Sequence, residues 1–243
     1  MKTGLKGRPI LVTGATGGIG SATVRLLVDE GARVLASGRD EEKLSGLSQE
    51  LGCETLPFDL TSEEDVDAAL SGRELYGVVN CGGWGGEIAT PMDTDTAVFD
   101  KVIDINAKGT LLVTKYAAKG MIKAGNGGAI VNVSSQASLV GLAGHISYAS
   151  SKGAVDAMTR VSALELGKHK IRVNAVNPTV VMTPMSEWYW GRDEIGGPLL
   201  DAMPLHRWAT EDDCAAPIVF LLSDAAAMIS GVCLPIDGGF TAV

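Results

Sequence analysis

Residues 9–28 read P-I-L-V-T-G-A-T-G-G-I-G-S-A-T-V-R-L-L-V, and this stretch decides the fold. The apolar run 9–13 predicts a short buried strand, and residues 24–28 continue with the spacing of a helix. Glycines let a backbone turn sharply and approach a ligand closely, and free amides at a helix start attract an anion. A strand, a glycine loop and a helix in this order therefore predict a diphosphate-binding site. The alternative is that the glycine loop is only a flexible turn. The loop has the pattern G-x-x-x-G-x-G at Gly14, Gly18 and Gly20.

The alternation of strand and helix continues along most of the chain. It predicts one domain over residues 1–243, an α/β Rossmann-type doubly wound parallel sheet with helices on both faces and ligands at the carboxyl ends of the strands. Only 184–207 breaks the rhythm, and Trp188, Tyr189 and Trp190 within it predict an irregular insertion covering an apolar or polyol ligand. The other predicted strands span 33–37, 54–58, 77–80, 129–134 and 172–177, and the other predicted helices span 63–70, 97–122 and 148 onward.

Composition limits the possible partners. Hydrophobic residues make up 46% and charged residues 20% of 243, which is typical of a globular protein. No apolar run is long enough to span a membrane, and the run at 10–12 is too short for a signal peptide, so we expect a cytoplasmic protein. A net charge of −9 argues against nucleic-acid binding. Neither disulfides nor a metal site is indicated by the scattered Cys53, Cys81, Cys214 and Cys233.

The end of the second predicted strand indicates the type of dinucleotide. It reads Ser37-Gly38-Arg39, with no acidic residue before the arginine. A guanidinium pairs with phosphate through two hydrogen bonds, so Arg39 suits the 2′-phosphate of NADP; the alternative is an ordinary surface arginine, and Asp40 is a complication. Asp59, after the third predicted strand, is placed either to accept a hydrogen bond from adenine or to cap the next helix. We expect NADP(H) as cofactor.

Tyr148 and Lys152 are candidate catalytic residues. If the segment is helical, residues four apart share one face, and a cation beside a phenol favours proton transfer from that phenol to a carbonyl oxygen. Ser135 follows a predicted strand opposite them, and Asn106 is an amide in an apolar helical run that needs partners. By itself, Y-x-x-x-K also fits a packed tyrosine beside a solvated lysine. The glycine-rich loop after Asn80 contains Trp84, which covers the cleft or packs on it.

Taken together, these motifs resemble those of the short-chain dehydrogenase/reductase family over nearly the whole chain. They include T-G-A-T-G-G-I-G at 13–20, N-C-G-G at 80–83, N-V-S-S at 132–135, Y-x-x-x-K at 148–152, N-P at 177–178 and D-G-G at 237–239. The resemblance implies an oxidoreductase whose catalytic residues are Asn106, Ser135, Tyr148 and Lys152, with Asn106 holding a water that resupplies protons through the lysine. It implies cofactor contacts at Gly14, Thr16, Gly18, Ile19, Gly20, Arg39, Asp59, Leu60, Asn80, Tyr148, Lys152, Val181 and Thr183.

Residues 169–183, the run N-V-S-S-Q from Asn132 and L-L-S-D at 221–224 are similar to the L-xylulose reductase (dicarbonyl/carbonyl reductase) subgroup. That implies NADPH-dependent reduction of L-xylulose to xylitol, reversibly, or of diketones such as diacetyl, by a homotetramer. The alternatives are a 3-oxoacyl thioester reductase, another sugar-alcohol or secondary-alcohol dehydrogenase, or a non-catalytic NADP-binding sensor. Cys81 and Gly82 depart from the family pattern, and Gly17 stands where the subgroup often has a basic residue. Implied substrate contacts are Ser135, Gln136, His145, Tyr148 and Trp190.

Overall fold

The computed structural model describes residues 3–183 and 186–242. In this part of the chain seven parallel strands form one sheet in the order β3-β2-β1-β4-β5-β6-β7. The chain moves outward from β1 to β3 and then returns to β4 on the other side of β1. This topology confirms the predicted doubly wound sheet and places its switch point between β1 and β4. The strands are β1 Pro9–Thr13, β2 Arg33–Ser37, β3 Glu54–Thr55, β4 Gly77–Asn80, β5 Gly128–Val133, β6 Ile171–Pro178 and β7 Cys233–Ile236.

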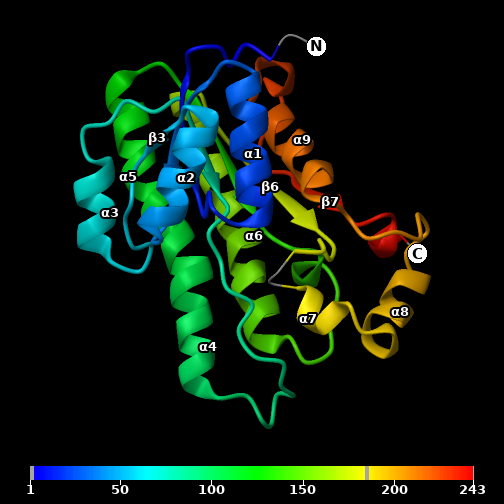
Figure 1. Cartoon of the computed structure of the whole chain (residues 1–243). Helices are drawn as coiled ribbons and strands as arrows, with labels where there is room; N and C mark the ends of the chain where they lie inside the picture. The colour runs from blue at the N-terminus through cyan, green and yellow to red at the C-terminus, as the bar shows by residue number, and fades with distance from the viewer. Residues whose placement is uncertain (1–2, 184–185, 243) are drawn as a thin grey trace.

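Helices cover both faces of the sheet (Figure 1). Ile10 and Val12 of β1 belong to the core that packs against α1, α2 and α9, whereas Leu11 belongs to the core formed with α3 and α5. Successive strand side chains point to opposite faces, so the sheet is buried on both sides. No helix of the described ranges has both the length and the apolar character needed to cross a membrane. The helices are α1 Gly18–Asp29, α2 Glu41–Leu51, α3 Glu63–Leu70, α4 Thr96–Ile103, α5 Gly109–Ala124, α6 Ile146–Leu166, α7 Glu187–Trp190, α8 Asp193–Asp201 and α9 Glu211–Leu222.

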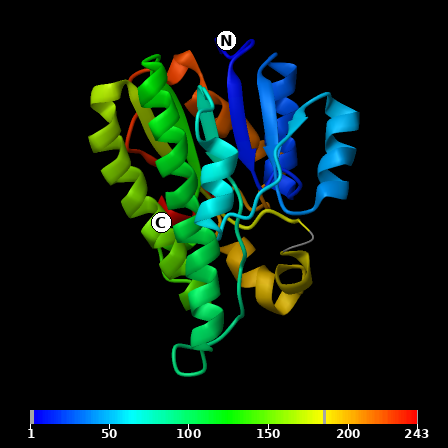
Figure 2. The same cartoon turned by 90° about the vertical axis from the view of Figure 1, so that its left-hand side faces the viewer.

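The carboxyl end of the sheet carries the loops that form the site. The α4 helix with its preceding loop, and the short helices α7 and α8, extend beyond this end of the sheet (Figures 1 and 2). At the switch point, the loops after β1 and β4 meet backbone to backbone. A Cβ atom added at Gly14 would lie 2.8 Å from the Gly82 nitrogen. Glycine is therefore required where these two loops cross.

Two predicted elements differ from the structure, and one strand of the structure was not predicted. The predicted helix over 97–122 is interrupted after α4 by a π-helical turn, Asp104–Lys108, before α5 begins. The third strand pairs through Glu54 and Thr55, because Pro57 lacks the N–H needed to continue the ladder. The edge strand β7 was not predicted; it contains Pro235, which only an edge strand tolerates easily.

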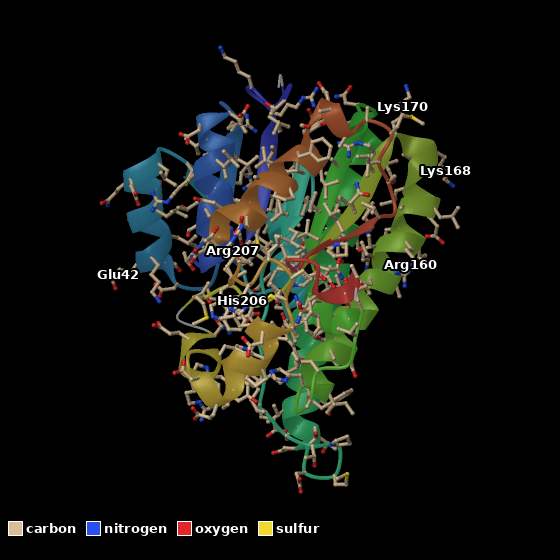
Figure 3. The ribbon with its side chains drawn as sticks, turned by 90° about the vertical axis from the view of Figure 1, so that its right-hand side faces the viewer. Glu42, Arg160, Lys168, Lys170, His206 and Arg207 are labelled. Atoms are coloured by element: carbon tan, nitrogen blue, oxygen red, sulfur yellow. The ribbon has the colours of Figure 1, made fainter. Side chains whose placement is uncertain are left out.

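The segment 184–207, predicted as an irregular insertion, is more regular than expected, while its predicted role in covering a ligand stays a prediction. Pro184 and Met185 lie outside the described residues, and most of the remaining segment is helical, in α7 and α8. The end of this segment, at His206 and Arg207, lies far from the residues that follow α6, Lys168 and Lys170 (Figure 3). Trp188, Tyr189 and Trp190 all lie within the short helix α7 rather than on an irregular loop.

Candidate active site

Three neighbouring cavities lie at the carboxyl ends of the strands. The central cavity is lined by Gly18, Ser135, Tyr148, Lys152 and Thr183, among others. The arginine cavity is lined by Thr16, Ser37, Arg39, Asp59 and Leu60, among others. The aromatic cavity is lined by His145, Tyr148, Trp188, Tyr189 and Trp190, among others.

The glycine loop forms one end of the central cavity. A Cβ atom at Gly20 would lie 2.1 Å from the Gly14 carbonyl oxygen, and one at Gly18 would lie 2.6 Å from the Thr183 methyl carbon. Gly17, the N-cap of α1, has no side chain to cap the first turn, which leaves amides at the helix start without a side-chain partner, and Gly17 to Gly20 line the cavity. Close-packed glycines and free helix amides suit a diphosphate.

The arginine cavity has features that suit a phosphorylated ribose. The Ser37 hydroxyl is buried and has no hydrogen-bond partner among residues 3–183 and 186–242, and Arg39 lines the same cavity. The Asp40 carboxylate accepts a hydrogen bond from the Lys43 N–H at 3.0 Å as the N-cap of α2. Asp40 thus caps α2 and also pairs with the Lys43 ammonium at 3.2 Å, while its carboxylate stays ionised next to Arg39 in the sequence.

Asp59 also lines the arginine cavity, but it does not cap the following helix. Its Oδ1 accepts hydrogen bonds from the Thr61 N–H at 2.9 Å and from the Thr61 hydroxyl at 2.8 Å, and Ser62 is the N-cap of α3. The Thr61 N–H is the main reason that the pKa of Asp59 lies below its usual value, and the nearby Arg39 cation lowers it further. Asp59 is therefore an anionic acceptor in the wall, with Leu60 beside it.

Asn80 lies behind the cavities rather than in their walls. Its side-chain amide is buried and donates to Asn132 Oδ1 at 2.8 Å and to Thr114 Oγ1 at 3.2 Å, joining β4 to β5 and α5. It is not among the described residues that line the three cavities. Cys81 lines two of them, and burial raises the pKa of its thiol to about 11, so the thiol is neutral at pH 7.

Tyr148, Lys152 and Ser135 meet at the central cavity. The Lys152 Nζ donates to the Val133 carbonyl oxygen at 2.7 Å and lies 5.6 Å from the centroid of the Tyr148 ring, as the four-residue spacing on a helix predicts. Lys152 is buried, and the Val133 bond fixes its ammonium at the end of β5. The Ser135 Oγ accepts a hydrogen bond from the Ala137 N–H at 3.1 Å, so a ligand in this cavity can take the serine's O–H as a donor.

Asn106 lies in the π-helical turn and is 1% exposed. Its Oδ1 accepts from the Trp84 N–H at 2.8 Å, and its Nδ2 donates to the Trp84 carbonyl at 2.9 Å and to Ser151 Oγ at 3.0 Å. The Ser151 hydroxyl in turn donates to the Tyr148 carbonyl at 2.7 Å. The Asn106 side chain thus connects the Trp84 loop to the helix of Tyr148; its predicted role in holding a water stays a prediction.

His145 is a buried acceptor in the wall of the aromatic cavity. Its Nδ1 lies 2.7 Å from the Ala143 carbonyl oxygen. A carbonyl only accepts, so Nδ1 carries the hydrogen and Nε2 keeps its lone pair. Burial lowers the pKa of His145, partly offset by that hydrogen bond. The Trp190 ring stacks on the imidazole at 5.5 Å, and the Tyr189 ring meets it edge-on at 5.7 Å.

The structure places Trp190 at the aromatic cavity and separates Gln136 from it. Gln136 is buried beside the site, where its Oε1 has no hydrogen-bond partner within the described ranges, but it is not among the residues that line the three cavities. Ile19, Val181 and Thr183 line the central cavity, and their predicted contacts with the cofactor stay predictions. Among the described residues, sequence reasoning missed Lys101 in the arginine cavity, Ser186 between the central and aromatic cavities, and Ser151, none of which carries a sequence signal.

A doubly wound sheet with a glycine loop at its switch point, beside a half-buried tyrosine paired with a buried lysine, defines a dinucleotide-dependent oxidoreductase. Comparison with known proteins agrees. Residues 14–241 match the family described as enoyl-(acyl carrier protein) reductase. The chain is 43% identical over 243 residues to L-xylulose reductase of Mus musculus, covering 100% of both. It is 40% identical over 236 residues to D-erythrulose reductase of Gallus gallus, covering 97% of this chain and 96% of that one.

Among solved structures, a putative NAD(P) dependent gluconate 5-dehydrogenase from Beutenbergia cavernae, determined with bound NADP, superposes with a TM-score of 0.93 at 30% identity and 98% coverage of both chains. The chain belongs to the short-chain dehydrogenase/reductase family. It is an oxidoreductase that acts on CH–OH and C=O groups, and it is similar to L-xylulose reductases at about 40% identity.

Proposed function

We propose that this protein is an NADPH-dependent carbonyl reductase that converts L-xylulose to xylitol, reversibly, and also reduces small α-dicarbonyls such as diacetyl. One observation carries the proposal. The central cavity joins a hydroxyl, a phenol and an ammonium, from Ser135, Tyr148 and Lys152, to a glycine loop on one side and to the aromatic cavity on the other. Full-length relatives named for ketose reduction support the substrate class.

The walls fit NADP(H) on three observations: the close-packed glycine loop, the unpaired buried Ser37 hydroxyl and Arg39 in the same cavity. The residues that would hold the cofactor are Gly14, Thr16, Gly18, Ile19, Gly20, Arg39, Asp59, Leu60, Tyr148, Lys152, Val181 and Thr183. The Asn80 side chain would not touch the cofactor. It would position the backbone at the end of β4 through its hydrogen bonds to Thr114 and Asn132. When bound, NADPH supplies the hydride, and the protein handles orientation and the proton.

Three side chains of the protein would stabilise charge and transfer the proton. The Ser135 hydroxyl donates to the substrate carbonyl oxygen and stabilises the negative charge that develops there, an effect of about 10²–10³-fold for one such donor. The Tyr148 hydroxyl delivers the proton to that oxygen. The Lys152 ammonium, anchored on the Val133 carbonyl, places a positive charge beside the phenol as the proton leaves.

The aromatic cavity would receive the rest of the substrate. The Nε2 of His145 accepts a hydrogen bond from a substrate hydroxyl, and Trp190 packs beside it. Gln136 would bind substrate only after its side chain turns toward the cavity. We assign the part of the predicted insertion that the structure describes, residues 186–207, as the substrate-binding wall, since Ser186, Trp188, Tyr189 and Trp190 line the cavity.

A second ketose is the main alternative substrate, because one relative at 40% identity is named D-erythrulose reductase. A 3-oxoacyl thioester is the other alternative, since the matching family carries an acyl carrier protein in its description. A net charge of −9 disfavours docking of an acidic carrier. Parallel assays with L-xylulose, D-erythrulose and an acetoacetyl thioester rank the three.

Tyr148→Phe tests the assignment of the proton donor. The ring and its packing remain while the hydroxyl is lost, so turnover of L-xylulose and diacetyl should fall to background while NADPH still binds in calorimetry. Retained turnover would remove Tyr148 from the mechanism. Turnover of any carbonyl substrate by the wild type excludes the alternative of a non-catalytic sensor.

We also propose that the chain forms a homotetramer and works in the cytoplasm. Apolar side chains are exposed along the two long helices, Leu111 and Ile122 on α5, and Val161 and Leu164 on α6, and such patches mark interfaces. The four cysteines are free thiols, as suits a reducing compartment. Sedimentation equilibrium of the wild type should give four chains per particle, and Leu164→Glu should give smaller particles.

A further inference from the structure

Trp84 occupies the junction of the three cavities. It follows β4 and the turn of Cys81 to Gly83, and it is half-buried. In the described part of the chain, it is the one residue that lines the central, arginine and aromatic cavities together. Ligands in the cofactor cavities and in the substrate cavity therefore share this residue as a wall.

The backbone of Trp84 is held on both of its polar groups by one buried side chain. Asn106 accepts from its N–H at 2.8 Å and donates to its C=O at 2.9 Å. Asn106 is itself held, through Ser151, to the carbonyl of Tyr148. Buried hydrogen bonds are costly to leave unmade, so this clamp fixes Trp84 relative to the proton donor.

The surroundings of Trp84 make this clamp necessary. The flanking residues are glycines: Gly83, where an added Cβ atom would lie tightly against Asn106 Oδ1 at 3.2 Å, and then Gly85 and Gly86, the latter with a positive φ of 74°. Glycines restrict a loop least of all residues. The indole itself has the Lys101 ammonium 4.8 Å from its ring, a cation–π contact from α4.

We propose that Trp84 determines which substituents on the substrate carbonyl are accepted, and that Asn106 is the positioning residue that holds it in place. A rigid indole between the cavities leaves room for a short carbon chain and excludes a ring or a branched group. This inference rests on the proposed carbonyl reductase activity and deepens it: the substrate is an unbranched ketone of a few carbons, with one small carbonyl substituent on the side of Trp84.

A matched pair of dicarbonyls tests the proposal without relying on L-xylulose. Diacetyl and 1-phenyl-1,2-propanedione differ by a methyl against a phenyl group. In Trp84→Ala, the ratio of kcat/KM for the phenyl compound to that for diacetyl should rise at least about tenfold over the wild type, the scale of a shape difference in a pocket. An unchanged ratio in Trp84→Ala, with the fold intact by circular dichroism, would overturn the proposal. If Trp84→Ala does not fold, Trp84→Phe should shift the ratio in the same direction by less.

NADPH binding gives a second readout that does not depend on turnover. Trp84 lines both cofactor cavities, so Trp84→Ala should weaken NADPH binding several-fold in calorimetry. Trp188→Ala is the control for loss of an indole, because Trp188 lines the aromatic cavity alone and should leave NADPH affinity unchanged. Equal NADPH affinity in the wild type, Trp84→Ala and Trp188→Ala would contradict the proposal that Trp84 forms part of the cofactor site. If the wild type reduces no dicarbonyl, the proposed function fails, while this binding comparison still decides the role of Trp84.

Hydrogen exchange tests Asn106 separately. In the wild type, the Trp84 amide is bonded to a buried oxygen and should exchange slowly. Asn106→Ala should speed exchange in the peptide containing Trp84 about tenfold or more and shift the dicarbonyl ratio as Trp84→Ala does. Asn106→Asp keeps an acceptor for this N–H and should keep the slow exchange. If Asn106→Ala lowers kcat for every substrate equally and leaves exchange unchanged, Asn106 does not position Trp84.

Discussion

His145 gives a sharp prediction, because the Ala143 carbonyl fixes the tautomer of its neutral ring and burial favours that neutral form. The Ala143 carbonyl takes the Nδ1 hydrogen, so Nε2 is the ring atom left to accept from a substrate hydroxyl. Asparagine at this position keeps an N–H near Ala143 and removes the acceptor, whereas glutamine places an amide near the lost Nε2. Diacetyl has no hydroxyl and serves as the internal reference.

The expected size of the effect follows from one unpaired polar group. Leaving a buried hydroxyl without its partner costs about 1–3 kcal/mol, or roughly 5–150-fold. His145→Asn should therefore lower kcat/KM for L-xylulose by that factor and change the value for diacetyl less than about twofold, with His145→Gln between it and the wild type. The assay is NADPH oxidation with each substrate.

The pH dependence of the wild-type enzyme gives a further prediction, the direction in which kcat/KM changes with pH. Burial holds the pKa of His145 below its usual 6.5, so the neutral acceptor is present at pH 8 and is lost as the pH falls through a pKa lower than that of a free imidazole. The kcat/KM for L-xylulose relative to diacetyl should therefore decline at low pH with a midpoint below pH 6.5. A midpoint above pH 6.5, or an equal loss on both substrates in His145→Asn, would refute the assignment.

Three other contacts give predictions that need one variant each. Gly20→Ala should abolish NADPH binding in calorimetry, because the added Cβ would lie 2.1 Å from the Gly14 carbonyl oxygen; wild-type affinity would contradict that close approach. Arg39→Gln should raise the KM for NADPH about tenfold to a hundredfold and leave that for NADH unchanged, whereas equal shifts for both cofactors would separate Arg39 from the 2′-phosphate. Asp213→Asn should lower the melting temperature less at pH 3 than at pH 7. The Arg207 guanidinium holds the pKa of Asp213 in the folded protein well below its ordinary 3.8, so the carboxylate stabilises the fold fully at pH 7 and less below pH 3.8, where the unfolded chain binds a proton that the folded chain does not. An equal loss at both pH values would contradict this.

The sequence predicted the sheet where local signals were strong. The strands Pro9–Thr13, Arg33–Ser37 and Gly77–Asn80 and the helix Glu63–Leu70 have the predicted bounds. Glycine or proline marks an end of each strand, and acidic residues mark the first turn of the helix. The sequence did not predict the π-helical turn at Asp104–Lys108. The extra residue in this turn leaves the apolar pattern of a long helix nearly unchanged, so the sequence gives no signal of it. The turn nevertheless contains Asn106 and sets the direction of its side chain.

The site shows the same division between local and long-range information. The spacing of Tyr148 and Lys152 is local to one helix, and the structure brings them together. Asn80 and Gln136 lie in matching motifs, but their side chains turn away from the cavities, since rotamers depend on neighbours far along the chain such as Asn132. The contact of Lys101 with Trp84 has no counterpart in sequence spacing for the same reason.

The central claim, that the Ser135, Tyr148 and Lys152 cavity reduces a ketose with NADPH, is tested most directly by kcat/KM for L-xylulose, followed through NADPH oxidation. We expect a value above about 10⁴ M⁻¹s⁻¹, the lower edge of ordinary enzyme efficiency. Tyr148→Phe measured beside it should bind NADPH and show only background oxidation. A wild-type protein that binds NADPH and reduces neither L-xylulose, D-erythrulose nor diacetyl would contradict the claim.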